Sequence, residues 1–114
     1  MGSQEDIEVA AILCEKGRFR HALFFAHLAI EKALKAHVSR HTGEVPPKVH
    51  NLTRLAEKAA LSLDPAQRDL LLAFDEYQLE GRYPDMVSAP IEGCEAREQL
   101  ANAEGIQQWL ISQL

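Results

Sequence analysis

The sequence predicts a single all-α domain, an up-and-down bundle of four or five helices. Apolar residues recur at steps of three and four over most of the chain, which is the period of an amphipathic helix. Residues that begin or end helices separate these runs, and no segment alternates apolar and polar residues as a half-buried strand does. Since 114 residues suffice for one buried core, one domain over residues 1–114 is expected.

The first helix is expected to begin near Ser3 and to end at Gly17. Ser3 precedes Asp6 by three residues, as in a weak capping box, and glycine is a natural helix terminator. The apolar residues of this segment share one helical face: Ile7, Ala10, Ala11 and Cys14. Because Cys14 and Cys94 are far apart and no disulfide framework is implied, both are expected to be small buried hydrophobes.

The second helix carries the strongest pattern. Its apolar stripe consists of Phe19, Leu23, Ala26, Ile30, Leu34 and His37, widened by Phe24, Phe25 and Leu28. A helix that is apolar over so much of its girth lies at the centre of a bundle or at an interface, and on this ground the chain is expected to dimerise. Glu31 and Lys35, four residues apart, predict a surface ion pair. The helix should end near residues 41–43.

The later helices begin at recognisable caps. Pro46 and Pro47 mark a loop, after which Asn51 can cap a short helix. The apolar residues of this short helix are Leu52, Leu55, Ala56 and Ala59. Asp64 predicts the next start, because Pro65 suits a first helical position and Gln67 completes a capping box.

The last two helices are separated by the stretch LEGRYPD, Leu79 to Asp85. Gly81 is expected to close the first of them. The final helix is expected to begin around Pro90. Its apolar face repeats at threes and fours through Ala96, Leu100, Ala103, Ile106, Leu110 and Leu114.

Composition excludes several classes of protein. No apolar run approaches the roughly 20 residues of a membrane span, and the acidic start lacks the features of a secretory signal, so a cytoplasmic protein is expected. The net charge of −5 is unevenly distributed, because residues 16–58 hold nine basic and three acidic residues. This basic segment could form a face for phosphates, or it could attract the acidic remainder within the bundle or across a dimer.

Two pairs of residues in the predicted helices could in principle bind a metal or act in acid–base catalysis. His37 and His41 lie one turn apart, as metal ligands can, but no third ligand is evident. His37 is therefore interpreted as a satisfied core or interface histidine, and no metal or other cofactor is expected. Asp75 and Glu76 could act as acid and base, but adjacent residues diverge on a helix, which favours a solvated acidic face.

The residues Arg82 to Asp85 (RYPD) form the main candidate site. An arginine fork, a stackable phenol at Tyr83 and the N–H groups that begin the last helix would together suit a nucleotide phosphate and base. In the structural alternative, Arg82 caps carbonyls of the preceding helix while Tyr83 packs over the end of the bundle.

Three stretches in this order resemble the HEPN domain in its stand-alone bacterial and archaeal branch. They are Ala29 to Lys35 (AIEKALK), Pro47 to Leu52 (PKVHNL) and Arg82 to Asp85 (RYPD), and the resemblance spans roughly Asp6 to Leu110. It implies a dimerising helical bundle, often encoded beside a minimal nucleotidyltransferase in a two-component, toxin–antitoxin-like system. Arg82, Tyr83, Asp85 and Lys35 are the residues expected to bind nucleotide or RNA.

Many relatives are metal-independent endoribonucleases whose motif is an arginine, four to six residues and then a histidine at the start of the last helix. This sequence departs from that motif, because no histidine follows His50. The leading hypothesis is therefore a binding module. The alternatives are a ribonuclease that uses Arg82 with His50 or Tyr83, and a purely structural dimer. Arg20 and His27 match the spacing, but they lie in the second helix.

Overall fold

The computed structural model describes residues 2–45, 51–82 and 92–114, and for residues 76–82 it describes the backbone alone. These ranges contain five helices and no strand, as the sequence predicts. The helices are α1 (Gly2–Glu15), α2 (Phe19–Thr42), α3 (Leu52–Lys58), α4 (Pro65–Arg82) and α5 (Gly93–Ser112).

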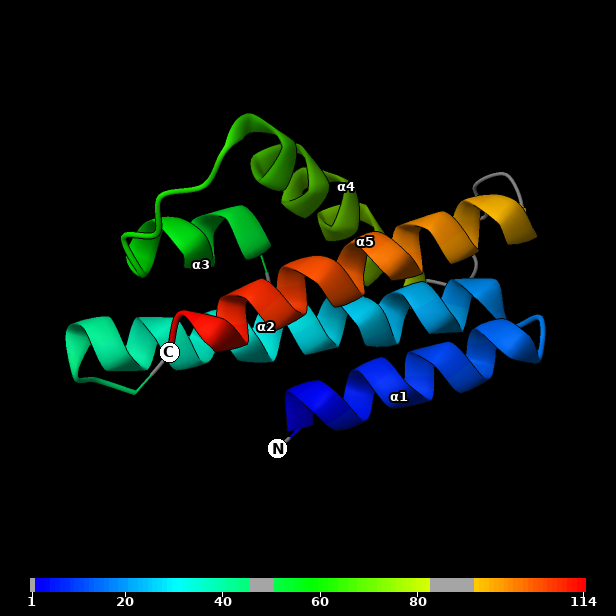
Figure 1. The fold of residues 1–114 in the computed structure, drawn as a ribbon, viewed down its shortest axis with the longest axis horizontal. Coiled ribbons are helices and arrows are strands. Elements are labelled where there is room, and N and C mark those ends of the chain that lie inside the picture. The colour runs from blue at the N-terminus through cyan, green and yellow to red at the C-terminus, as the bar shows by residue number, and fades with distance from the viewer. Residues whose placement is uncertain (1, 46–50, 83–91) are drawn as a thin grey trace.

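Helix α2 is the centre of the bundle and packs against each of the other four helices. Figure 1 shows α1 along one side of it, α3 and α4 on the other, and α5 lying over it. This position accounts for the wide apolar surface of α2, because its partners surround it within one chain. The central placement is therefore confirmed. Phe24 and Leu28, which widen the stripe, stay partly exposed, and the dimer expected from that width stays a prediction.

Small side chains allow these close approaches along α2. Four of its alanines are at most 1% exposed: Ala22, Ala26, Ala29 and Ala33. Larger side chains fill the space between them, and Leu23, Ile30 and Leu34 are fully buried. Such alternation of large and small side chains lets neighbouring helices interdigitate at the density of a protein interior.

Most of the predicted helix ends are confirmed. Gly17 and Gly43 adopt the left-handed conformation at φ +79° and +72°, which glycine reaches without a Cβ penalty. The side chain of Asn51 accepts the N–H of Arg54 at 2.9 Å. At the start of α4, Asp64 accepts the N–H of Gln67 at 2.7 Å, and the Gln67 side chain returns a bond to the N–H of Asp64 at 3.0 Å.

Three boundaries differ from the prediction. Helix α1 begins at Gly2, so Ser3 lies inside the helix and does not cap it. Helix α4 passes through Gly81 and ends at Arg82, since one glycine costs a helix only about 1 kcal/mol. Helix α5 begins at Gly93, three residues beyond Pro90, because the backbone of Glu92 is extended.

The two cysteines have different environments. Cys14 is buried in the core, as predicted, whereas Cys94 is exposed in the first turn of α5, so the prediction for Cys94 is wrong. Among the described residues, no helix combines the length and apolar character that a bilayer crossing requires.

The last helix packs mainly against α2 and only slightly against α4. In Figure 1, α4 descends obliquely from above the bundle and passes behind α5, so that its N-terminal part lies away from α5. The two helices that follow one another at the end of the chain are therefore splayed, which leaves a groove between them.

Candidate functional site

Arg82 is the last residue of α4 rather than the first residue beyond it. Its side chain, Tyr83, Asp85 and His50 all lie outside the described residues. Their role in binding nucleotide or RNA stays a prediction, and so does a contribution of His50 to cleavage.

The start of α5, which residues 83–91 connect to α4, lies against the start of α2. A Cβ placed on Gly93 would stand 3.0 Å from the Phe19 ring and 3.3 Å from Nη1 of Arg97. Four basic residues belong to this part of the bundle, which we call the basic end: Lys16, Arg18, Arg20 and Arg97. Figure 1 shows that the turn between α1 and α2 lies at the same end of the molecule as the first turn of α5.

Acidic residues moderate the charge of the basic end. Glu92 is the N-cap residue of α5 but makes no capping hydrogen bond through its side chain, and Glu95 lies in the first turn. Carboxylates interact favourably with the positive end of a helix dipole, so they compete with any external anion there. The basic side chains provide the remaining attraction for a phosphate group.

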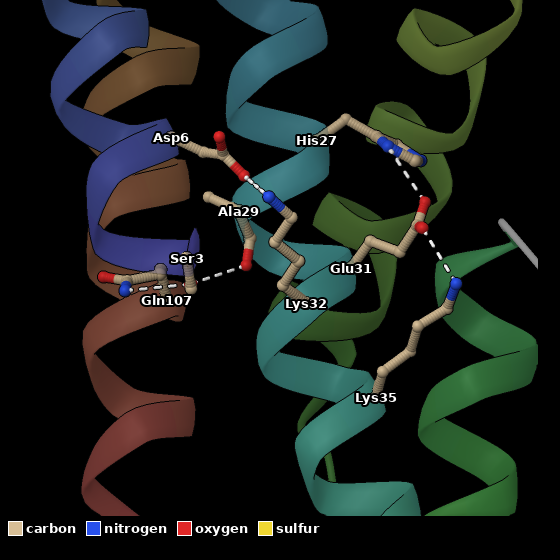
Figure 2. Close-up of polar contacts among 8 residues, drawn as sticks. All are labelled: Ser3, Asp6, His27, Ala29, Glu31, Lys32, Lys35 and Gln107. Atoms are coloured by element: carbon tan, nitrogen blue, oxygen red, sulfur yellow. Dashed lines mark hydrogen bonds and ion pairs between the residues drawn. The ribbon is translucent and has the colours of Figure 1, made fainter. Parts of the chain in front are cut away.

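Lys35 does not belong to the basic end. Figure 2 shows its ammonium directed at Glu31, with Nζ 3.1 Å from Oε2 of the carboxylate, and Nδ1 of His27 lies 3.7 Å from the other oxygen. Lys35 lies sixteen residues beyond Phe19, which is about 24 Å along α2. Glu31 is only 5% exposed, so the expectation of a surface pair is wrong.

The Arg20–His27 pair is not an accessible catalytic pair. His27 is fully buried, at 0% exposure, while Arg20 is partly exposed near the start of α2. An imidazole enclosed by the core cannot reach a 2′-hydroxyl of an RNA strand. The spacing therefore arises from the core pattern of α2 and does not mark a catalytic site.

His37 is a satisfied core histidine, as predicted. It is 7% exposed, and its Nε2 lies 2.6 Å from the carbonyl oxygen of Leu110 on α5. Because a carbonyl can only accept, Nε2 carries the proton. In the described part of the chain, no group of three or more His, Cys, Asp or Glu could hold a metal ion.

Asp75 has a structural role that the sequence did not reveal. Its Oδ1 accepts the backbone N–H of Leu52 at 2.7 Å, which ties α4 to the first turn of α3. Burial raises the pKa of this carboxyl above its ordinary value of 3.8, and hydrogen bonds from Leu52 and Thr53 oppose the rise only in part. The reading as a solvated acidic face is therefore wrong for Asp75, and the Glu76 side chain lies outside the described residues.

Two further polar contacts hold α1 in place. Figure 2 shows Ser3 between α2 and α5, where its hydroxyl donates to the carbonyl of Ala29 at 2.7 Å and accepts from the Gln107 amide at 3.1 Å. Asp6 lies 2.7 Å from the ammonium of Lys32 on α2. The one signal in the sequence was Gln107 itself, which falls among apolar residues at helical spacing.

Comparison with known proteins identifies one family. The model of the HEPN domain matches residues 2–114. No curated protein and no solved structure matches the chain.

Proposed function

This chain belongs to the HEPN domain family, and from that premise we propose that it is a binding module. In this proposal a dimer of the chain partners a minimal nucleotidyltransferase in a two-component system and holds a nucleotide or RNA near Arg82 and Tyr83. The observation that favours ligand binding over RNA cleavage is the placement of the histidines. None follows His50 in the sequence, so the last helix lacks the histidine of the ribonuclease motif.

Two of the four histidines of the described residues support this choice. All four lie on α2, where His27 and His37 are buried in the core and His21 and His41 are exposed. A general acid or base must come within hydrogen-bond reach of the reacting hydroxyl. The two buried rings are closed off from such a substrate.

The basic end supports the choice of ligand. Lys16, Arg18 and Arg97 are exposed, and Arg20 is partly exposed. These side chains belong to the same end of the bundle as the first turn of α5 (Figure 1), so a phosphate bound there would meet further positive charge. Arginine forks bind phosphate oxygens in pairs, and a nearby tyrosine can stack on a base.

Binding is tested by titrating the protein into fluorescein-labelled single-stranded RNA or a labelled adenine nucleotide and following the anisotropy. Arg82→Ala should weaken binding of at least one of the two probes about tenfold, since a hydrogen bond to a charged group contributes about 1.5–3 kcal/mol. Arg54→Ala removes an exposed base from α3, far from the basic end in sequence, and should change the affinity by less than about twofold. Equal losses in the two variants, or no saturable binding of either probe, would contradict the proposed site.

The partner is tested separately by co-expression. A tagged minimal nucleotidyltransferase should retain this chain through gel filtration as a complex of fixed composition. A nucleotidyltransferase that elutes alone at micromolar concentration would remove that part of the proposal and leave the nucleotide or RNA site standing.

A further inference from the structure

A groove with a volume of about 620 Å³ lies between α4 and α5. Its apolar floor is formed by Leu70 of α4 and by Ile106 and Trp109 of α5. Small residues widen it: Ala66, Ala73 and Gly105. Nothing in the proposed nucleotide or RNA site uses this surface, which is built from other residues.

The described part of the chain gives no packing reason for a glycine at position 105. It lies in the interior of α5, where glycine is less stable than alanine by about 1 kcal/mol. No described atom lies within 4 Å of a Cβ placed there, so packing inside the chain does not require its small size. Glycine at such a position permits another backbone to approach closely, and the open groove is where that backbone would lie.

The charge of the groove defines the chemistry of its occupant. Asp64 and Asp69 line it, and no basic residue does. Helices α4 and α5 together contain seven acidic and three basic residues, a net charge of −4. A partner with lysine or arginine beside an apolar stripe would complement both the floor and the rim.

The length of the groove fits a helix. Its residues on α5 recur at Gln99, Asn102, Ile106 and Trp109, a span of about 15 Å at 1.5 Å per residue. A partner helix of three turns or more would follow this face in the manner of other helix-in-groove complexes, with anchors at threes and fours. Trp109, partly buried at one end, is the kind of residue that concentrates binding energy.

We propose that the α4–α5 groove docks an amphipathic helix of a partner protein, with an apolar stripe flanked by lysines or arginines and a small residue facing Gly105. Neither α1 nor α3 of a second copy offers such a helix. The exposed apolar residues of α1, Val9 and Ile12, stand beside the acidic Glu5 and Glu8. Helix α3 is basic, but it has seven residues and its apolar face is already buried.

The test uses Trp109, the single tryptophan of the sequence, as a fluorescent reporter. The probe is a synthetic helical peptide with leucines at threes and fours, one central alanine and lysines on both flanks. The reference peptide carries glutamates in place of the lysines. The lysine peptide should shift the Trp109 emission in a saturable way, and the glutamate peptide should bind at least about tenfold more weakly, as opposite charge at a docking surface requires.

Gly105→Gln and Ala101→Gln form a matched pair of variants. Both add the same side chain to the exposed surface of α5, but only Gly105 lines the groove. Gly105→Gln should abolish the saturable shift while raising the melting temperature, because glutamine stabilises a helix relative to glycine. Ala101→Gln should bind as the parent protein does.

The proposal fails if the lysine peptide produces no saturable change, if the two peptides bind equally, or if both glutamine variants bind the peptide normally. Self-association of the chain that Gly105→Gln abolishes would also overturn it, because the occupant would then be a second copy. None of these outcomes depends on RNA or nucleotide binding, so the groove and the proposed site can fail separately.

Discussion

Glu31 illustrates how one buried charge organises its surroundings. Its carboxylate lies on α2 between the imidazole of His27 and the ammonium of Lys35, and its own side chain is almost fully enclosed. Lys35 differs because a quarter of its side chain is exposed. Removal of Lys35 and removal of the Glu31 charge are therefore expected to lower the stability of the fold by different amounts.

Removal of Lys35 should cost more stability than neutralisation of Glu31. Lys35→Met leaves the buried carboxylate without its ammonium, and we expect a loss of about 2–3 kcal/mol in the free energy of unfolding. Glu31→Gln should cost about 1 kcal/mol, because the freed ammonium can turn to water. Urea unfolding of each variant measures these losses, with the exposed Lys58→Met as the control. A greater loss for Glu31→Gln than for Lys35→Met would contradict this account.

The raised pKa of Asp75 predicts how the stability of the fold changes with pH. Because burial raises its pKa in the folded protein above 3.8, the folded state binds the proton more tightly, and Asp75 destabilises the fold increasingly as the pH rises through that range. The stability of Asp75→Asn relative to the parent should therefore increase with pH above 3.8 and then level off. Urea midpoints from about pH 3 to about pH 7 measure it. A relative stability that falls with pH would be inconsistent with the raised pKa.

At the scale of the helices, caps formed by residues within one turn could be predicted from the sequence, and contacts between residues far apart in the chain could not. Asn51, the pair Asp64–Gln67 and the glycines after α1 and α2 act on residues within one turn, so their pattern is visible in the sequence. Ser3 has the composition of a cap, but its partner is the carbonyl of Ala29, twenty-six residues away. Propensity cannot reveal such a contact, because tertiary packing decides it.

The same limit applies to the candidate site. The sequence singled out Lys35 through a resemblance, but its pairing with a buried Glu31 depends on what packs against α2. The bond between Asp75 and Leu52 links helices that are adjacent in space and twenty-three residues apart in the chain. The groove between α4 and α5 was also unforeseen, since helical periodicity shows an apolar face without showing which neighbour covers it.

Ser3 and Gln107 should be energetically coupled, because together they join α1, α2 and α5. Ser3→Ala leaves the Gln107 amide without its acceptor, and Gln107→Leu removes that amide. The double variant should therefore be more stable than the sum of the single losses implies, by about 0.5–1 kcal/mol. A double-mutant cycle by urea unfolding measures the coupling. The exposed Gln108→Leu in place of Gln107→Leu should show none, and additivity for Ser3 with Gln107 would disprove the junction.

At the scale of the whole molecule, one central helix and an uneven charge set the architecture. The described bases of residues 16–58 are spread over several parts of the bundle. Lys32 and Lys35 are committed to Asp6 and Glu31, while exposed bases stand at both ends of α2 and on α3. The basic segment and the acidic helix α1 therefore attract each other within the chain through the Lys32–Asp6 ion pair. The bases near the start of α2 are exposed or partly exposed, so an external anion could reach them.

We expect the chain to form a dimer, as its resemblance to the HEPN domain implies. Most of the apolar girth of α2 is used inside the bundle, while Phe24 and Leu28 stay partly exposed on it. Exposed apolar residues are available on α1, α4 and α5, including Ile12, Leu72 and Ile111. Multi-angle light scattering at micromolar concentration tests this expectation, and a monomeric mass there would count against it.

The central claim is that this HEPN domain binds its ligand without cutting RNA. The most direct test incubates labelled single-stranded RNA with the purified protein in EDTA, records the anisotropy, and then runs the same sample on a denaturing gel. The account predicts saturable binding, an affinity that Arg82→Ala lowers about tenfold, and intact RNA throughout. RNA fragments that the parent protein produces and Arg82→Ala does not would contradict it.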